Sequence, residues 1–145
     1  MDKIDLRWFL PAVLLYSLLV ASVCGAEEIN MDKIAMIESS GNPLAWNKKD
    51  NSRGIFQITP ICLKEYNNFH PGAEYTMDDL WNVSVSTLIA DWYINKRIPQ
   101  MIKHYGKEDT LENRIIAFNA GISYVVSGKP IPKITKDYLR KYNEQ

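Results

Sequence analysis

Apolar residues recur at intervals of three and four along most of this chain, and this spacing limits the folds that it can adopt. The clearest case is the stripe formed by Trp81, Val85, Leu88 and Trp92. Such an interval places side chains on one face of an α-helix, where they form a core more often than a ligand site. No convincing run of alternating apolar and polar residues indicates a strand. The fold is therefore predicted to be mainly α-helical.

Turn-forming residues divide the chain into separate helices. Helices are predicted over residues 29–39, 60–68, 79–97 and 133–144, with two shorter stripes at Ile98, Ile102 and Tyr105 and at Leu111, Ile115 and Phe118. Pro60 suits a first helical position, and Pro99 is expected to break or kink the longest helix. Asp109 and Glu112 have the spacing of a capping box. The stretch 44–58 is rich in Asn, Asp, Ser and Gly and predicts a loop with turns.

Length and charge indicate one small domain without an electrostatic specialisation. The 145 residues suit a single domain, and 17 Lys and Arg balance 17 Asp and Glu. Nucleic-acid-binding proteins usually carry a basic surplus that neutralises phosphates. We therefore expect no nucleic-acid partner, and we expect a monomer.

The N-terminal segment has the order of a secretory signal peptide. Residues 9–23 are uncharged and largely apolar, Lys3 and Arg7 precede them, and Cys24-Gly25-Ala26 follows. We predict a signal peptide over residues 1–26 and a mature domain over residues 27–145, exported to the periplasm or cell envelope. The alternative is an uncleaved inner-membrane anchor over residues 8–25, although the apolar run is short for a bilayer.

Cysteine and histidine give no sign of a cofactor. Without residues 1–26, Cys62 has no intramolecular partner, and we expect it to be a half-buried helical thiol. His70 and His104 have no metal-ligand spacing and are expected at the surface. The chain has no His-Glu-x-x-His, no phosphate-binding Gly-rich loop and no nucleophile elbow. Neither a metal nor a cofactor is predicted.

Basic residues gather near the C-terminal end of the sequence. They are Lys129, Lys133, Lys136, Arg140 and Lys141. The simplest interpretation is a solvated helix face, and the alternative is a surface that attracts an anionic cell-wall polymer in a salt-dependent way.

Glu38 is the best candidate for a chemical role. It borders the apolar face formed by Ile34, Ala35 and Ile37, at the C-terminal end of its predicted helix. An apolar neighbourhood and the negative end of the helix dipole both favour the protonated carboxyl. A carboxyl that stays neutral near pH 7 can act as a general acid. Most helix-end glutamates are instead solvated or hydrogen-bonded, which is the alternative.

Four ordered motifs include or follow Glu38. They read Glu38-Ser39-Ser40-Gly41-Asn42-Pro43, Ser52-Arg53-Gly54-Ile55-Phe56-Gln57-Ile58-Thr59-Pro60, Ala117-Phe118-Asn119-Ala120-Gly121 and Pro132-Lys133-Ile134-Thr135-Lys136-Asp137-Tyr138. In this order and spacing, the set resembles the soluble lytic transglycosylase (SLT) domain family over residues 29 to 142. The resemblance implies a mainly α, goose-type-lysozyme-like single domain with a glycan-binding cleft.

The resemblance also implies individual roles. Glu38 corresponds to the family's sole catalytic acid and base, Ser39 to the serine that positions the site, and Tyr138 to a tyrosine whose hydroxyl reaches the catalytic carboxyl. The residues expected to line or support the sugar cleft are Ser52, Gln57, Phe118 and Asn119. Gly54 is expected to let the backbone approach the glycan closely.

Two positions depart from the family pattern. Phe118 stands where a tyrosine is usual, and Ile134 stands where a glutamate is common. A hydroxyl at the first position and polar support at the second are therefore missing. Neither change touches Glu38, so we expect activity to survive.

A lytic transglycosylase is the implied enzyme. Enzymes of this type cleave the β-1,4 bond between N-acetylmuramic acid (MurNAc) and N-acetylglucosamine (GlcNAc) in peptidoglycan and form 1,6-anhydro-MurNAc. One alternative is a hydrolytic lysozyme on the same fold, with nearby polar residues such as Asp50 assisting water. Another is a non-catalytic peptidoglycan-binding assembly protein. Small stand-alone domains of this kind resemble those that open the wall for a secretion, conjugation or pilus machine, which would be a partner.

Overall fold

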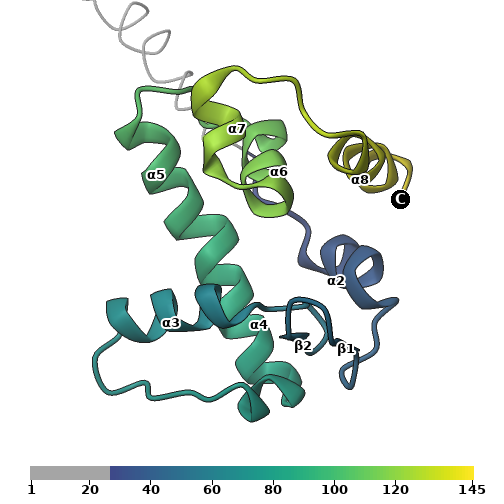
Figure 1. Cartoon of the computed structure of the whole chain (residues 1–145), viewed down its shortest axis with the longest axis vertical. Coiled ribbons are helices and arrows are strands. Elements are labelled where there is room, and N and C mark those ends of the chain that lie inside the picture. Colours follow the sequence, from purple (N-terminus) through teal and green to yellow (C-terminus); the bar gives the residue numbers. More distant parts are fainter. Residues whose placement is uncertain (1–26) are drawn as a thin grey trace, which may run out of the picture.

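The computed structural model describes residues 27–145, which form a mainly α-helical domain, as predicted (Figure 1). The predicted signal peptide over 1–26, and the alternative anchor over 8–25, lie outside the described residues. Within residues 27–145, no helix combines the length and the apolar character needed to cross a membrane.

Helices alternate with short connections along the described chain. The α-helices are α2 (Met31–Ser39), α3 (Pro60–Phe69), α4 (Val83–Trp92), α5 (Ile98–His104), α6 (Leu111–Ala120), α7 (Ile122–Ser127) and α8 (Lys133–Glu144). A 3-10 helix, η2 (Asp78–Trp81), precedes α4, and a π-helical turn, η3 (Tyr93–Arg97), joins α4 to α5. Strands β1 (Trp46–Asn47) and β2 (Ser52–Arg53) form a small antiparallel hairpin.

Caps explain why α2 and α3 begin where they do. The Asn30 side chain accepts hydrogen bonds from the backbone N–H groups of Asp32 and Lys33, which have no partner inside the helix. The Thr59 side chain caps α3 in the same way, and Pro60 occupies its first turn. The helices predicted over 29–39, 60–68 and 133–144 are confirmed.

The prediction for the longest helix was wrong at both ends. Asn82 accepts hydrogen bonds from the N–H groups of Ser84 and Val85 and so starts a new helix after η2. Pro99 does not break the rod, which continues through η3 into α5 (Figure 1). The register of backbone hydrogen bonds changes at the π-helical turn η3. Pro99, which has no backbone N–H, is therefore tolerated in the first turn of α5, just beyond η3.

The expected apolar stripe is confirmed only in part, because Val85 and Trp92 pack against the core while partly buried. Leu88 is 48% exposed, whereas Ser86, Ile89 and Ile94 are completely buried. The fully buried positions of α4 thus lie one residue beyond Val85 and Leu88. Tyr105, predicted to continue the stripe of Ile98 and Ile102, is also exposed.

The predicted capping box before α6 does not form. Thr110 caps the helix through the N–H of Asn113, at 3.1 Å. Asp109 instead accepts two hydrogen bonds from the buried Arg114 guanidinium, at 2.7 and 2.9 Å. A charged pair of this kind outcompetes a helix-end contact for the same carboxylate.

The stretch 44–58 contains the small hairpin in place of turns alone. Trp46 pairs with Arg53 and Asn47 with Ser52. Two residues per strand are too few to show an alternating pattern, which is why the sequence predicted only a loop.

Gly54 approaches the backbone of η2 closely. Its φ is +79°, and a Cβ at this position would lie 2.2 Å from the backbone oxygen of Leu80 in η2. The close approach that excludes a side chain is thus between the hairpin and η2. It fixes the hairpin on the rest of the domain, and the expected approach of Gly54 to a glycan stays a prediction.

The core joins α2, the segment after the hairpin, α3, α4 and α8. Its members include Ile34, Phe56, Leu63, Ile89 and Tyr142. A second, smaller cluster lies where α5, α6 and α7 meet. Helix α8 is held on α2 by the Tyr142 hydroxyl, which accepts from the N–H of Asn30 at 2.8 Å, and by Lys33, which donates to the Tyr142 carbonyl at 3.1 Å. These contacts fix α2 and α8 on one side of a cleft.

Candidate active site

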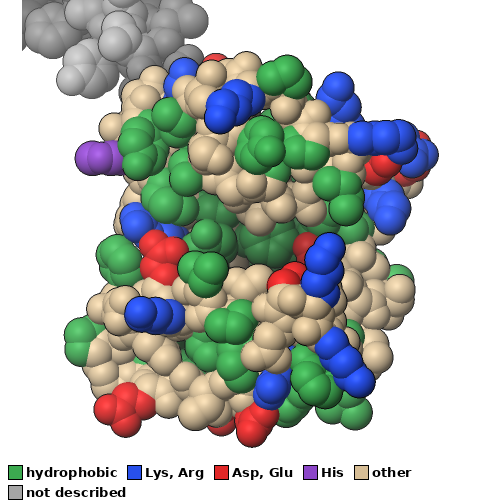
Figure 2. Space-filling model, viewed as in Figure 1, with side chains coloured by type: hydrophobic (Ala, Val, Ile, Leu, Met, Phe, Trp, Pro, Cys, Tyr) green, Lys and Arg blue, Asp and Glu red, His purple; other side chains and the backbone are tan. Residues whose placement is uncertain are grey.

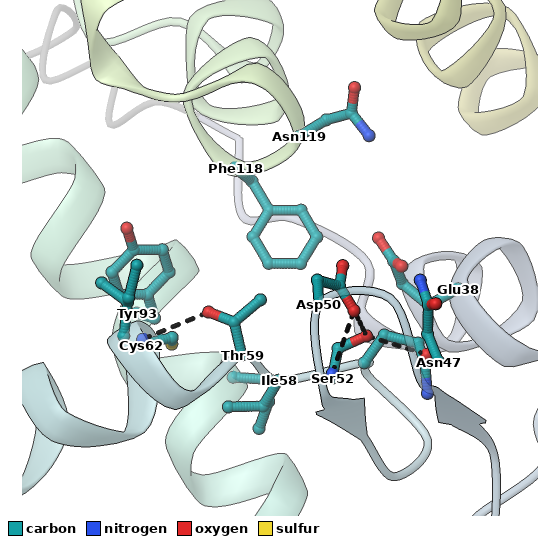
Figure 3. Close-up of a pocket in the computed structure, with 13 residues that line it drawn as sticks. Glu38, Asn47, Asp50, Ser52, Ile58, Thr59, Cys62, Tyr93, Phe118 and Asn119 are labelled. Atoms are coloured by element: carbon teal, nitrogen blue, oxygen red, sulfur yellow. Dashed lines mark hydrogen bonds between the residues drawn. The ribbon is translucent and has the colours of Figure 1, made fainter.

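A cleft of about 390 Å³ opens between the hairpin and α3 on one side and the end of α6 on the other. Figure 2 shows the hollow in the middle of the face drawn. Its lining residues are Glu38, Asn47, Asp50, Ser52, Gln57, Ile58, Thr59, Ile61, Cys62, Ala90, Tyr93, Phe118 and Asn119 (Figure 3). Five of the seven predicted site residues line it, namely Glu38, Ser52, Gln57, Phe118 and Asn119.

Glu38 occupies the last turn of α2 and faces this cleft (Figure 3). Burial raises the pKa of its carboxyl to about 7, the Tyr138 hydrogen bond opposes this, and the nearby charge of Asp50 adds to it. The sequence predicted the direction of this shift. The main cause is removal from water, as the apolar face of α2 suggested.

Tyr138 contacts Glu38 from α8, a hundred residues further along the chain. Its hydroxyl donates to Oε1 of Glu38 at 2.8 Å, and its ring is buried. Burial and the Glu38 carboxyl both raise the pKa of Tyr138, so the phenol stays protonated and acts as a donor. The contact implied by the family resemblance is present.

Ser39 lies beside the cleft and does not line it. Its hydroxyl donates to the carbonyl of Ile55 at 2.8 Å, with a longer contact of 3.3 Å to Ala35 within α2. The first bond ties the end of α2 to the segment that follows the hairpin. Ser39 therefore positions the helix that carries Glu38.

Ser52 and Gln57 form a polar network inside the hairpin segment. The buried Ser52 hydroxyl lies 2.8 Å from Oδ1 of Asp50 and 3.1 Å from Oε1 of Gln57. The Gln57 amide donates to the carbonyls of Ala45 and Gly54, at 3.0 and 2.9 Å. Both amide hydrogens of Gln57 are thus used internally, so this side chain shapes the wall of the cleft.

Phe118 and Asn119 approach from the end of α6. Figure 3 shows the Phe118 ring pointing into the cleft and the Asn119 amide directed away from it, toward α8. The rings of Phe118 and Tyr138 meet edge to face, 6.5 Å between centroids. The ring at position 118 therefore still packs without the usual hydroxyl. Oδ1 of Asn119 is buried and has no hydrogen-bond partner among residues 27–145.

Asp50 lines the cleft, a location that could not be predicted from the sequence. Its Oδ1 accepts from the N–H and the hydroxyl of Ser52, at 3.0 and 2.8 Å, and these bonds lower the pKa of its carboxyl. An ionised carboxylate therefore lies in the same cleft as Glu38 (Figure 3). The signal in the sequence was its position two residues before Ser52, where an Asp commonly accepts from the backbone of a turn.

Comparison with protein families gives a match to the transglycosylase SLT domain over residues 25–138. The chain belongs to this family. Membership indicates a peptidoglycan-degrading activity of the lytic transglycosylase type, with peptidoglycan as the substrate. Comparison with curated proteins and comparison with solved structures each gave no match.

The far end of the SLT cleft is formed by α3 and η3. Thr59, Ile61, Cys62 and Tyr93 line it, and sequence motifs pointed to none of them as cleft residues. Cys62 is a partly buried thiol on α3, as predicted, and burial raises its pKa to about 12. A thiol with this pKa is not a nucleophile near neutral pH.

The histidines of the SLT domain lie outside the cleft. His104 is exposed, as predicted, but His70 is half-buried, stacked on Tyr66 with 4.1 Å between ring centroids. Its Nδ1 lies 2.9 Å from the Tyr66 carbonyl. Across the described part of the chain, no group of three or more His, Cys, Asp or Glu side chains is arranged to hold a metal ion.

Tyr138→Phe should raise the pKa of Glu38 above about 7, because the hydrogen bond from the phenol lowers it. The basic limb of the pH–rate profile should then move to higher pH, and the maximal rate should fall by roughly tenfold, since the carboxyl loses its fixed orientation. Initial rates of peptidoglycan cleavage between pH 5 and 9 check this. Tyr124→Phe, which removes a hydroxyl from α7, is the matched control and should change neither quantity. If the basic limb of the pH–rate profile does not move in Tyr138→Phe, the hydrogen bond from Tyr138 does not set the pKa of Glu38.

Proposed function

We propose that this protein is a lytic transglycosylase that cleaves the MurNAc-β-1,4-GlcNAc bond, with Glu38 as its single general acid and base. The observation that carries the proposal is a carboxyl with a pKa of about 7, buried at a cleft and bound by a tyrosine hydroxyl. A group with this pKa is present in both protonation states at neutral pH. It can therefore donate a proton in one step and accept one in the next.

In the first step, Glu38 protonates the glycosidic oxygen. Because Oε1 already accepts the Tyr138 hydrogen bond, Oε2 is the oxygen left to carry the acidic proton. Protonation lets the C1–oxygen bond break, and the leaving GlcNAc departs with a neutral hydroxyl. The N-acetyl oxygen of the muramic residue shares its electrons with C1 and stabilises the developing positive charge.

In the second step, the C6 hydroxyl of the same muramic residue attacks C1. Glu38, now a carboxylate, removes the hydroxyl proton as the C6–oxygen–C1 bond forms and the N-acetyl oxygen is released. The products are a 1,6-anhydro-MurNAc end and a GlcNAc end. Glu38 regains its proton, and no water is consumed.

Asp50 favours a second candidate, a hydrolytic muramidase. Many glycosidases use two carboxyl groups, one neutral and one ionised. Glu38 and Asp50 have these opposite tendencies in one cleft, since burial raises the first pKa and the Ser52 hydrogen bonds lower the second. In a hydrolase, the Asp50 carboxylate would stabilise the sugar cation or orient the attacking water.

Asp50→Asn separates the two candidates. Loss of this charge should lower the pKa of Glu38, so the basic limb of the pH–rate profile should move to lower pH by a fraction of a unit. The proposed transglycosylase should keep its anhydro products and lose less than about tenfold in rate. A hydrolase that needs this carboxylate should lose about 10²-fold or more.

Glu74→Gln is the matched control for Asp50→Asn, because it removes one exposed negative charge outside the cleft. It should leave the pH profile unchanged. If both variants shift the limb equally, the effect comes from net charge and not from the position of Asp50.

Mass spectrometry of the products tests the proposal itself. Peptidoglycan digested by the purified protein should yield anhydro-muramic ends, which are lighter by one water than reducing ends. Reducing ends would establish the muramidase. Binding of glycan strands without any turnover would instead support the non-catalytic assembly protein.

We further propose that the protein acts as an exported monomer in the periplasm or cell envelope. The support is the uncharged run over residues 9–23, followed by small residues. A small domain that cuts the wall locally suits a secretion, conjugation or pilus machine. Fractionation of cells, followed by detection of the protein with an antibody, tests the location.

A further inference from the structure

A second hollow adjoins the catalytic cleft on the side of α8. Its volume is about 390 Å³, and it is lined by Ile37, Glu38, Asn119, Ile134, Asp137, Tyr138, Arg140 and Lys141. Glu38 and Asn119 line both hollows. A sugar whose glycosidic bond lies at Glu38 therefore borders the second hollow, which we call the α8 hollow.

One stripe of α8 forms the wall of the α8 hollow. Ile134, Asp137, Tyr138 and Lys141 are spaced by three and four residues, so they share a face of the helix. Ile134 is 73% exposed, although it is a large apolar side chain on a helix that otherwise buries Tyr138 and Tyr142. An exposed apolar residue beside a hollow is a natural contact for an apolar part of a ligand.

The charges of the α8 hollow favour an anionic ligand. Arg140 and Lys141 bring two positive charges, against the two acidic side chains Asp137 and Glu38. Asp137 is already paired with Lys133, at 3.0 Å, and burial keeps Glu38 partly protonated near neutral pH. Arg140 lies 3.6 Å from Asp137 and 3.7 Å from Glu144, in exposed pairs that hold it only weakly. Lys141 forms no ion pair among the described residues. Both cations can therefore turn toward a carboxylate at little cost.

We propose that the α8 hollow binds the stem peptide of peptidoglycan, with Arg140 and Lys141 on its carboxylates and Ile134 against its alanine methyl groups. This inference rests on the proposed function, because it assumes that a muramic residue lies at Glu38. Muramic acid carries its peptide through a lactyl ether on the sugar ring. The peptide is therefore attached to the glycan strand next to the bond that is cut. The α8 hollow begins at the same place, because Glu38 lines it.

The proposal predicts a preference for strands that still carry peptides. Uncross-linked glycan strands with stem peptides are compared with the same strands after an amidase has removed the peptides. The wild-type protein should show a KM roughly five- to tenfold lower for the peptide-bearing strands, since two partly exposed charge contacts are gained. Added salt should reduce this preference.

The double substitution Arg140→Gln/Lys141→Gln should bring the two KM values together. Lys129→Gln/Lys136→Gln is the matched control: it also removes two exposed basic residues, and neither lines a hollow. The control should keep the preference. An equal loss in both double variants, or a wild-type protein that does not distinguish the strands, would overturn the proposal.

Binding separates this inference from the proposed function. Glu38→Gln protein is titrated calorimetrically with both kinds of strand, so that no turnover is needed. Tighter binding of peptide-bearing strands, lost in the triple variant that adds Arg140→Gln and Lys141→Gln, would support the α8 hollow even if wild-type products contradicted a transglycosylase. Equal binding of both strands would refute it even if anhydro products were found.

Discussion

Glu38→Gln should leave a folded protein whose cleavage of peptidoglycan is slower by a factor of about 10²–10⁴. Glutamine keeps the shape of the side chain and can still accept the Tyr138 hydrogen bond through its amide oxygen. It has no acidic proton to give to the glycosidic oxygen. The release of soluble muropeptides from purified peptidoglycan measures the loss, and a near-wild-type rate would rule out Glu38 as the acid.

The same variant should be more stable than the wild type at pH 8. A carboxyl with a pKa of about 7 in the folded state and about 4.5 when unfolded destabilises the fold as pH rises between these values. Below pH 4.5 both states are protonated and the penalty is absent, and above pH 7 it is complete, at about 3 kcal/mol.

Urea unfolding at pH 4 and pH 8 measures how the difference in stability between Glu38→Gln and the wild type changes with pH. Glu38→Gln should gain free energy of unfolding over the wild type at pH 8 and should match it at pH 4. The experiment also serves as the folding control for the activity loss, because a variant that is inactive and unfolded at both pH values would say nothing about catalysis.

Gly54→Ala should destabilise the domain by about 3 kcal/mol or more. The added Cβ would lie 2.2 Å from the Leu80 carbonyl oxygen and 3.1 Å from Oγ of Ser86, and the backbone φ of +79° disfavours any L-residue. The contact is with backbone, so it is relieved only if the hairpin moves away from η2. Gln57, which bonds to the Gly54 carbonyl, would move with it.

Gly106→Ala isolates the conformational part of this effect. Gly106 has a φ of +66°, and a Cβ there would meet nothing within 4 Å. We expect this variant to lose only about 1 kcal/mol. Thermal unfolding of both variants, with cleavage rates measured well below the transition, checks the difference. If Gly54→Ala and Gly106→Ala are destabilised equally, the steric contact between a Cβ at position 54 and the Leu80 carbonyl contributes no free-energy penalty.

The sequence predicted best the features that depend on local chemistry. Helices α2 and α3 were expected within two residues of their bounds, because the apolar face of the first and Pro60 at the start of the second are local signals. The raised pKa of Glu38 could also be foreseen, since it follows from the neighbours of one residue on one helix.

Long-range contacts were beyond such reasoning. The pairing of Asp109 with Arg114 in place of a helix end depends on which groups compete for a partner after packing. Which face of α4 is fully buried depends on the elements that pack against it. Asp50 likewise became a cleft residue through its bonds to Ser52 and the turn of the hairpin. The contact between Glu38 and Tyr138 came only from the family resemblance, because it spans a hundred residues.

The position of α8 has a consequence for when the contacts around Glu38 are complete. This helix follows every other described element, and it supplies both the donor to Glu38 and the Tyr142 contacts that hold α2 in place. A chain that is cut before Lys133 therefore lacks the donor to Glu38 and the Tyr142 contacts to α2, even when the other helices are present. The contact between Tyr138 and Glu38 therefore forms only after residues 133–142 have been made, even when the earlier helices are already folded.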